Sequence, residues 1–334
     1  MTLESEEQAA TSEPEFEALA RQALPLYGLD ADSDVTLINH SENLTYRIDA
    51  ADGKSVLRVH RPGYQTRESI LSEIAWMKAL QEQAGVQTPQ AIAGADGEPL
   101  QTMPGTDGRY CVRFAWIDGE LPKETDALDE LLDPFEQLGE ITARLHEHVR
   151  NWQPPPGFTR QCWDFDGTIG AAPIWGSFRL CPVLGPAAHS LLDRTVDVMQ
   201  RRLDAYGDGP NRFGLIHADL RLGNLLIHSG NVRVIDFDDS GTSWFGYDLG
   251  AALSFMEDRD DVPALVGAWV RGYRRNAALS AAEETELTTF IILRRLVLLG
   301  WIGSRAESDL AQEMQDGFAQ GTCAIAEKYL QQFG

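Results

Sequence analysis

The sequence has 334 residues, of which 43% are hydrophobic and 24% are charged, so it fits a globular chain of one large or two moderate domains. Its formal net charge of −23 at pH 7 argues against nucleic acid or an anionic membrane as partner, because both would repel it. The four cysteines are widely spaced and form no Cys-x-x-Cys motif, which favours the reducing cytoplasm over a disulfide framework or a zinc site.

The first third of the chain is predicted to form a small antiparallel sheet. An acidic tail over residues 1–14 is expected to be disordered, and a helix follows from Phe16 to Tyr27. Strand patterns then occupy 35–38, 44–48 and 55–59, and the segments 89–100 and 109–116 complete the sheet. We place this domain at 15–113 and an interlobe hinge at 114–119, where the composition changes.

A helix is predicted between these strands, from its cap at Thr66 to about Gln83. Its apolar face also carries Glu73, and a carboxylate on a buried face requires a cation. A glutamate that leans inward and reaches water with its carboxylate is the alternative.

After residue 119 the chain becomes mainly helical, and we assign 120–334 to a second domain. An apolar stripe runs through 128–149, and further helices are expected at 186–206, 264–278, 283–302 and 310–330. The most apolar run, Phe290–Ile302, is interrupted by Arg294 and Arg295 and is too short to span a bilayer, so we predict a buried helix and no membrane anchor.

One stretch carries the chemistry. Leu215 and Ile216 indicate a buried strand end that delivers His217, Asp219 and Asn224 onto a turn, and a second apolar strand at 232–235 ends at Asp236. We expect these side chains at the ends of adjacent strands. A carboxylate that orients a hydroxyl, together with oxygen ligands for magnesium, is what phosphoryl transfer needs.

The order His-x-Asp-x-x-x-x-Asn, followed by Asp on a second strand, resembles the catalytic core of the protein-kinase-like superfamily. The His-Ala-Asp form and the Ile-Asp-Phe-Asp-Asp end resemble its aminoglycoside phosphotransferase and choline kinase family, including homoserine kinase type II and the bacterial stress-response kinases. The resemblance implies a mixed α/β (α+β), bilobal fold with a small antiparallel-sheet lobe and a larger helical lobe, with ATP and Mg²⁺ between them.

The resemblance also implies roles for the motif residues. Asn224 and Asp236 would bind the metal, and Asp219 would position the acceptor hydroxyl and take its proton late. Arg221 would stabilise charge on the transferring phosphoryl group, with a solvated loop arginine as the alternative. His217 and Asp248 would hold the catalytic turn together.

The nucleotide-binding residues depart from the family pattern. Arg58 replaces the usual lysine on the α- and β-phosphates, paired with Glu73. The expected phosphate-covering turn at 39–43 has no glycine, so side-chain contacts there fall to Ser41 or Asn43. Adenine would meet backbone groups of the hinge near Ala115 and Ile117.

The acceptor is not readable from the sequence. Inserts after the 128–149 helix help form the acceptor pocket in this family, so Trp163, Asp164 and Trp175 within 151–213 are candidate substrate contacts, with ordinary packing as the alternative. We expect a small-molecule hydroxyl: an amino alcohol, sugar or aminoglycoside. Oligomeric state is unreadable too.

Three other functions remain open: a protein Ser/Thr kinase of the stress-response type, a non-catalytic nucleotide-binding homologue, and a phosphohydrolase. The last rests on Asp164-Phe-Asp-Gly-Thr168, which spells the nucleophile motif of haloacid-dehalogenase-like enzymes. That chemistry needs a buried strand before Asp164, and the preceding Pro154-Pro-Pro156 segment favours a loop.

Overall fold

The computed structural model describes residues 13–40, 43–106, 108–307 and 309–334. The chain divides into two compact units. The first reaches Lys78 and also includes Pro89–Ile117 and Pro156–Thr159, whereas the second comprises Ala79–Thr88, Asp118–Pro155 and Arg160–Gly334. Most of the predicted acidic tail lies outside the described residues.

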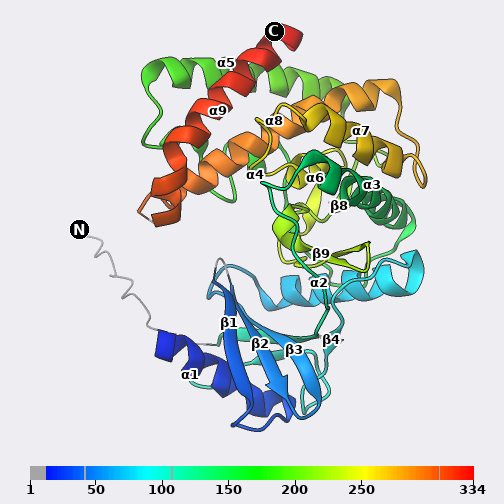
Figure 1. The fold of residues 1–334 in the computed structure, drawn as a ribbon, viewed down its shortest axis with the longest axis vertical. Coiled ribbons are helices and arrows are strands. Elements are labelled where there is room, and N and C mark those ends of the chain that lie inside the picture. The colour runs from blue at the N-terminus through cyan, green and yellow to red at the C-terminus, as the bar shows by residue number, and fades with distance from the viewer. Residues whose placement is uncertain (1–12, 41–42, 107, 308) are drawn as a thin grey trace. The chain divides into compact units, whose positions relative to one another are not determined.

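An antiparallel sheet forms most of the first unit, as predicted (Figure 1). Its strands follow the order β1-β2-β3-β6-β4, and β5 pairs with β6. The strands are β1 Asp34–His40, β2 Leu44–Ala50, β3 Gly53–Val59, β4 Ala91–Ile92, β5 Leu100–Thr102 and β6 Tyr110–Ala115. In β2 the side chains of Leu44, Tyr46 and Ile48 are buried and alternate with half-buried residues, which is the period of two that a one-sided sheet requires.

Two helices accompany this sheet, α1 Glu13–Ala23 and α2 Arg67–Ala79. Ala20 and Ala23 of α1 join Tyr46 and Leu57 in one apolar cluster, so one face of the sheet is closed by this helix. The helical path after α1 ends at Gly28, whose φ of 67° is the left-handed conformation that glycine adopts at helix ends.

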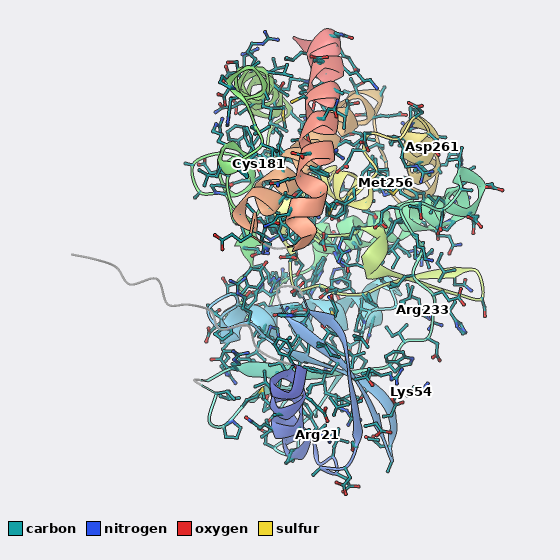
Figure 2. All side chains as sticks on the ribbon, turned by 60° about the vertical axis from the view of Figure 1, so that its left-hand side comes forward. Arg21, Lys54, Cys181, Arg233, Met256 and Asp261 are labelled. Atoms are coloured by element: carbon teal, nitrogen blue, oxygen red, sulfur yellow. The ribbon has the colours of Figure 1, made fainter. Side chains whose placement is uncertain are left out.

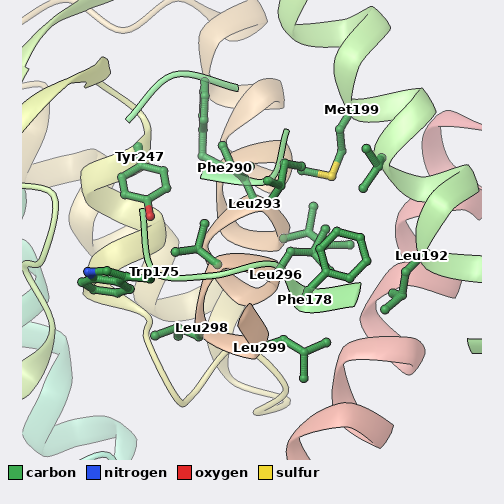
Figure 3. Packing of buried hydrophobic residues seen from close by; sticks show 14 of the residues in the cluster. Trp175, Phe178, Leu192, Met199, Tyr247, Phe290, Leu293, Leu296, Leu298 and Leu299 are labelled. Carbon is green, nitrogen blue, oxygen red and sulfur yellow. The ribbon is translucent and has the colours of Figure 1, made fainter. Parts of the chain in front are cut away.

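The second unit is mainly helical. Its helices are α3 Leu128–Asn151, α4 Phe165–Thr168, α5 Pro186–Tyr206, α6 Tyr247–Ala252, α7 Val262–Tyr273, α8 Ala281–Ser304 and α9 Asp309–Phe333. Figure 3 shows α8 at the centre of the main apolar cluster, with Leu293, Leu296 and Phe290 on its surface. By length and composition alone α8 could cross a membrane, but 78% of its most apolar 18-residue stretch is buried inside the protein. The predicted buried helix is confirmed.

Short strands position the catalytic stretch. β8 Phe213–Ile216 pairs with β11 Gly241–Trp244, which also pairs with β7 Gln161–Cys162. β9 Leu225–His228 forms a separate hairpin with β10 Asn231–Val234. Asn224 and Asp236 flank the same end of the paired strands β9 and β10, as expected, whereas the expectation is wrong for Asp219, because β8 pairs with β11. The hairpin closes through Ser229 and Gly230, both with positive φ, and such two-residue turns pair β10 with β9 rather than with β8.

Helices α3 and α7 approach closely through glycines. A Cβ at Gly272 of α7 would lie 1.8 Å from the Glu136 carbonyl oxygen, and one at Gly139 of α3 would lie 2.0 Å from that of Trp269. Backbone atoms cannot move aside as a flexible side chain can, so these glycines set the helix separation.

We expect Gly272→Ala to lower the free energy of unfolding by about 2 kcal/mol or more, because the new methyl group forces the helices apart. Gly267→Ala on the same helix is the matched control, since a Cβ there meets only Arg271 Nη1 at 3.8 Å. The control should be neutral or stabilising by up to about 1 kcal/mol. Urea denaturation of both variants checks this, and equal stability of the two would contradict it.

Candidate active site

The catalytic turn follows β8 and is held from α6. Ala218 has a φ of 67°, an uncommon conformation for a non-glycine residue. Asp248, fully buried in the first turn of α6, accepts hydrogen bonds from both adjacent amides: Ala218 N to Oδ1 at 2.8 Å and His217 N to Oδ2 at 3.3 Å. This carboxylate compensates the strained peptide and fixes the direction in which the turn leaves the sheet.

A second layer fixes Asp248 itself. His146 of α3 is fully buried, and its Nε2 lies 3.0 Å from Asp248 Oδ2 while its Nδ1 lies 3.0 Å from the Tyr273 hydroxyl. Because a carboxylate can only accept, Nε2 carries the proton and Nδ1 accepts from the tyrosine. Burial lowers the pKa of His146, against the opposing effect of Asp248, so the ring stays neutral.

His217 connects the turn to the segment after β10. Its Nδ1 accepts from Asp219 N at 3.3 Å, and its Nε2 donates to Ile235 O at 3.1 Å. Ile235 N in turn donates to Asn224 O at 2.9 Å. These bonds bring the peptide preceding Asp236, which has a φ of 64°, against the turn that carries Asp219 and Asn224.

Both oxygens of the Asp219 carboxylate accept hydrogen bonds. Asn224 Nδ2 donates to Oδ2 at 2.7 Å, and Arg221 Nε approaches the same oxygen at 3.4 Å. Arg294 Nη2, from α8, donates to Oδ1 at 2.5 Å. Each carboxylate oxygen has two lone pairs, so capacity remains for the hydroxyl of an acceptor.

Burial would raise the pKa of Asp219, but the positive charges of Arg294 and then Arg221 outweigh it and hold the pKa below its usual range. The carboxylate is therefore ionised throughout the neutral range. Such a group orients a hydroxyl and accepts its proton late, which suits a reaction dominated by positioning.

The sequence interpretation missed Arg294. It treated this residue and Arg295 as interruptions of an apolar helix. The signal was nevertheless present, because a charge that interrupts a buried helix requires a buried partner. No local spacing rule names Asp219 as that partner, since the two are 75 positions apart.

The roles of Asn224 and Asp236 as metal ligands stay predictions. The Asn224 amide nitrogen donates to Asp219, which leaves the amide oxygen facing away from that carboxylate. Among the described residues there is no group of three or more His, Cys, Asp or Glu side chains that could hold a metal alone. A pair of oxygen ligands suits Mg²⁺, which takes its remaining ligands from water and substrate phosphates.

The first unit contains the predicted ion pair. Arg58 Nη2 donates to both Glu73 oxygens, at 2.6 and 2.7 Å, and both side chains are buried. The guanidinium lies 5.1 Å from the Phe114 ring centroid. Lys54, the other cation of β3, is exposed (Figure 2). The pairing is confirmed, and a contact between Arg58 and phosphate stays a prediction.

The remaining nucleotide-binding candidates are Ser41, Asn43, Ala115 and Ile117. Asn43 is buried, and its Oδ1 accepts from Arg61 N at 3.1 Å. Ser41 lies outside the described residues. The Ala115 N–H donates to Gln90 O at 2.8 Å, so this donor is used within the sheet, and Ile117 is half-buried at the end of the first unit.

The substrate-contact candidates of the 151–213 segment have structural partners. Asp164 caps α4 by accepting from Gly167 N at 2.8 Å, and Trp163, 1% exposed, donates its indole N–H to Asp239 O at 2.8 Å. Trp175 packs edge-on against Trp163, with ring centroids 5.2 Å apart. The contacts of Trp163 and Trp175 are those of packed side chains, which was the alternative to a substrate contact.

The phosphohydrolase interpretation is wrong. Asp164 follows β7, which has only two residues and pairs in a small sheet with β11 and β8. The motif continues as the short helix α4, in which Asp164 is the cap. Within the part of the chain that the structure describes, no doubly wound sheet surrounds it.

Comparison with known proteins agrees with this geometry. The family model "Phosphotransferase enzyme family" (APH) matches residues 34–284. A solved microcompartment-associated aminopropanol kinase is 40% identical, with a TM-score of 0.88, over 95% of this chain and 98% of that chain. Amicoumacin kinase of Bacillus subtilis (strain 168) is 23% identical over 85% of this chain and 84% of its own length.

A further solved structure, an amicoumacin kinase in complex with AMP-PNP, Ca²⁺ and Ami, covers 93% of this chain and 92% of its own with a TM-score of 0.73 and 22% identity. At that identity the likeness shows the fold. The sheet-rich unit and the larger helical unit are those of a bilobal, protein-kinase-like phosphotransferase. The chain belongs to the phosphotransferase enzyme family, as its catalytic motif predicted.

Proposed function

We propose that this enzyme transfers the γ-phosphoryl group of Mg·ATP to the hydroxyl of a small amino alcohol in the cytoplasm. The observation that carries the proposal is the ionised Asp219 carboxylate, held at both oxygens on a turn that also presents Asn224 and leads to Asp236. A fixed acceptor for the hydroxyl proton beside oxygen ligands for a metal is the arrangement phosphoryl transfer requires.

Asp219 would accept the hydroxyl hydrogen bond and turn the acceptor oxygen toward phosphorus, taking the proton as the new P–O bond forms. Asn224 and Asp236 would hold the metal, which when bound neutralises charge on the phosphates. Arg221 is the cation of this turn, and its side chain is 33% exposed. It would stabilise the charge that develops on the transferring phosphoryl group.

Two considerations favour an amino alcohol among hydroxyl acceptors. The chain as a whole carries a net charge of −23, which attracts cations. The relative that is 40% identical over nearly the whole chain is named as an aminopropanol kinase.

We expect wild type to release ADP from Mg·ATP when supplied with ethanolamine, 1-amino-2-propanol or 3-amino-1-propanol, and less readily with sugars or aminoglycosides. Asp219→Ala should lower kcat by about 10²–10⁴-fold, because it removes the proton acceptor. Asp204→Ala, an exposed carboxylate of α5, is the control. Retention of more than about a tenth of wild-type turnover by Asp219→Ala would rule out Asp219 as the base.

Chelation tests the metal. EDTA should abolish turnover and added Mg²⁺ should restore it, since the metal is bound through only two protein side chains together with the nucleotide. Asp236→Asn should raise the Mg²⁺ concentration needed for half-maximal activity by about tenfold or more, because a charged ligand becomes neutral. Turnover that persists in EDTA would contradict the assignment of Asn224 and Asp236.

Nucleotide binding tests Arg58. Arg58→Met should raise KM for ATP by about 10- to 100-fold, as expected for a charge-assisted hydrogen bond to phosphate. Arg58→Lys should recover most of this because it keeps the charge. Lys54→Met, on the same strand but exposed, should leave KM unchanged. The reverse order of the two methionine variants would move the phosphate contact to Lys54.

A further inference from the structure

Helix α8 buries two adjacent arginines, Arg294 and Arg295, each 1% exposed, in an otherwise apolar run. Removing an ionised side chain from water is unfavourable unless its partners compensate. Consecutive helical residues point in directions about 100° apart, so the two side chains need separate partners. The partners distinguish their roles.

Arg295 joins parts of the framework. Its Nη1 donates to Glu257 Oε2 at 2.7 Å and its Nε to Thr322 Oγ1 at 3.1 Å, while its guanidinium lies 3.5 Å from the Phe318 ring centroid. These contacts link α8 to α9 and to the segment before α7. None of them involves the catalytic turn.

Arg294 faces the catalytic turn instead. Besides its bond to Asp219 Oδ1 at 2.5 Å, its Nη1 donates to the carbonyl oxygen of Ala218 at 3.2 Å. One guanidinium therefore holds both the carboxylate and the strained peptide before it. Arg294 also lies beyond residues 34–284, the part of the chain that the family model matches.

The guanidinium is itself immobilised. Its Nε donates to Ser254 Oγ at 2.9 Å, its Nη1 lies 3.4 Å from the Tyr247 hydroxyl, and its centre lies 4.8 Å from the Trp175 ring centroid. Figure 3 shows the Tyr247 hydroxyl directed toward Trp175 beside α8. A planar group engaged at its edge and its face cannot rotate freely, unlike a lysine ammonium.

We propose that Arg294 is a positioning residue for phosphoryl transfer: it fixes the Oδ1 atom of Asp219 so that the carboxylate is aimed at the acceptor hydroxyl. This inference rests on the proposed role of Asp219. Arg294 acts through Asp219 and does not itself touch substrate. Trp175, at first a candidate substrate contact, then serves the reaction by packing on this guanidinium.

A matched pair of charge-preserving variants tests the proposal. Arg294→Lys should lower kcat by about 10- to 100-fold with KM for ATP nearly unchanged, because a small misplacement of the carboxylate is costly. Arg295→Lys should lower Tm about as much as Arg294→Lys does, but its kcat should stay within about twofold of the wild-type value. Equal kcat losses in the two variants would show a merely structural effect and overturn the proposal.

A double-mutant cycle adds a readout that a structural role would not move. In the Asp219→Asn background, Arg294→Lys should change the residual turnover by less than about threefold, because Arg294 has lost the group through which it acts. A multiplicative loss would overturn the proposal. Should Arg294→Lys fail to fold, Ser254→Ala loosens the same guanidinium: its kcat should fall by about threefold or more, and an unchanged kcat would overturn the proposal.

The probe is Mg·ATP with 1-amino-2-propanol, and basal ATP hydrolysis serves if that acceptor is inert. An inert acceptor contradicts the acceptor proposal alone. Full activity of Asp219→Asn contradicts the proposed site. An inactive Asp219→Asn beside a fully active Arg294→Lys contradicts only the role of Arg294.

Discussion

An ionised carboxylate held inside the protein is the constraint around which the larger unit is arranged. Asp219 is 7% exposed, and burial alone would favour its neutral form. Arg294, Arg221 and Asn224 supply the charge and hydrogen bonds that keep it ionised and oriented. Those partners come from its own turn and from α8. The position of the Asp219 carboxylate therefore depends on how α8 packs.

The turn that carries Asp219 is itself held by buried hydrogen bonds. Asp248 holds the two amides before Asp219, and neutral His146 holds Asp248 from α3. His146 is held in turn by Tyr273 of α7, and α7 meets α3 at the glycine contacts. The glycine spacing, the buried histidine and the strained Ala218 peptide therefore form one chain of dependence. A change in helix separation is expected to reach the catalytic turn through these hydrogen bonds.

Much of this could be predicted from the sequence, because local rules suffice for it. Alternation predicted the strands of the sheet, and helical spacing placed Glu73 on a buried face. The roles that the motif gives to Asp219, Asn224 and Asp236 stay predictions. The prediction was wrong about the partner of β8, because the pairing of β8 with β11 rather than with the β9–β10 hairpin depends on tertiary contacts. Arg294 was missed for the same reason, because its partner is remote in sequence.

The acceptor remains beyond the catalytic motif, since the motif positions a hydroxyl whatever molecule carries it. The most direct test of the account is ³¹P NMR of wild type with Mg·ATP and 1-amino-2-propanol. The account predicts a phosphomonoester resonance that grows in step with ADP and is absent with Asp219→Asn. ADP accompanied only by inorganic phosphate would contradict transfer to the amino alcohol.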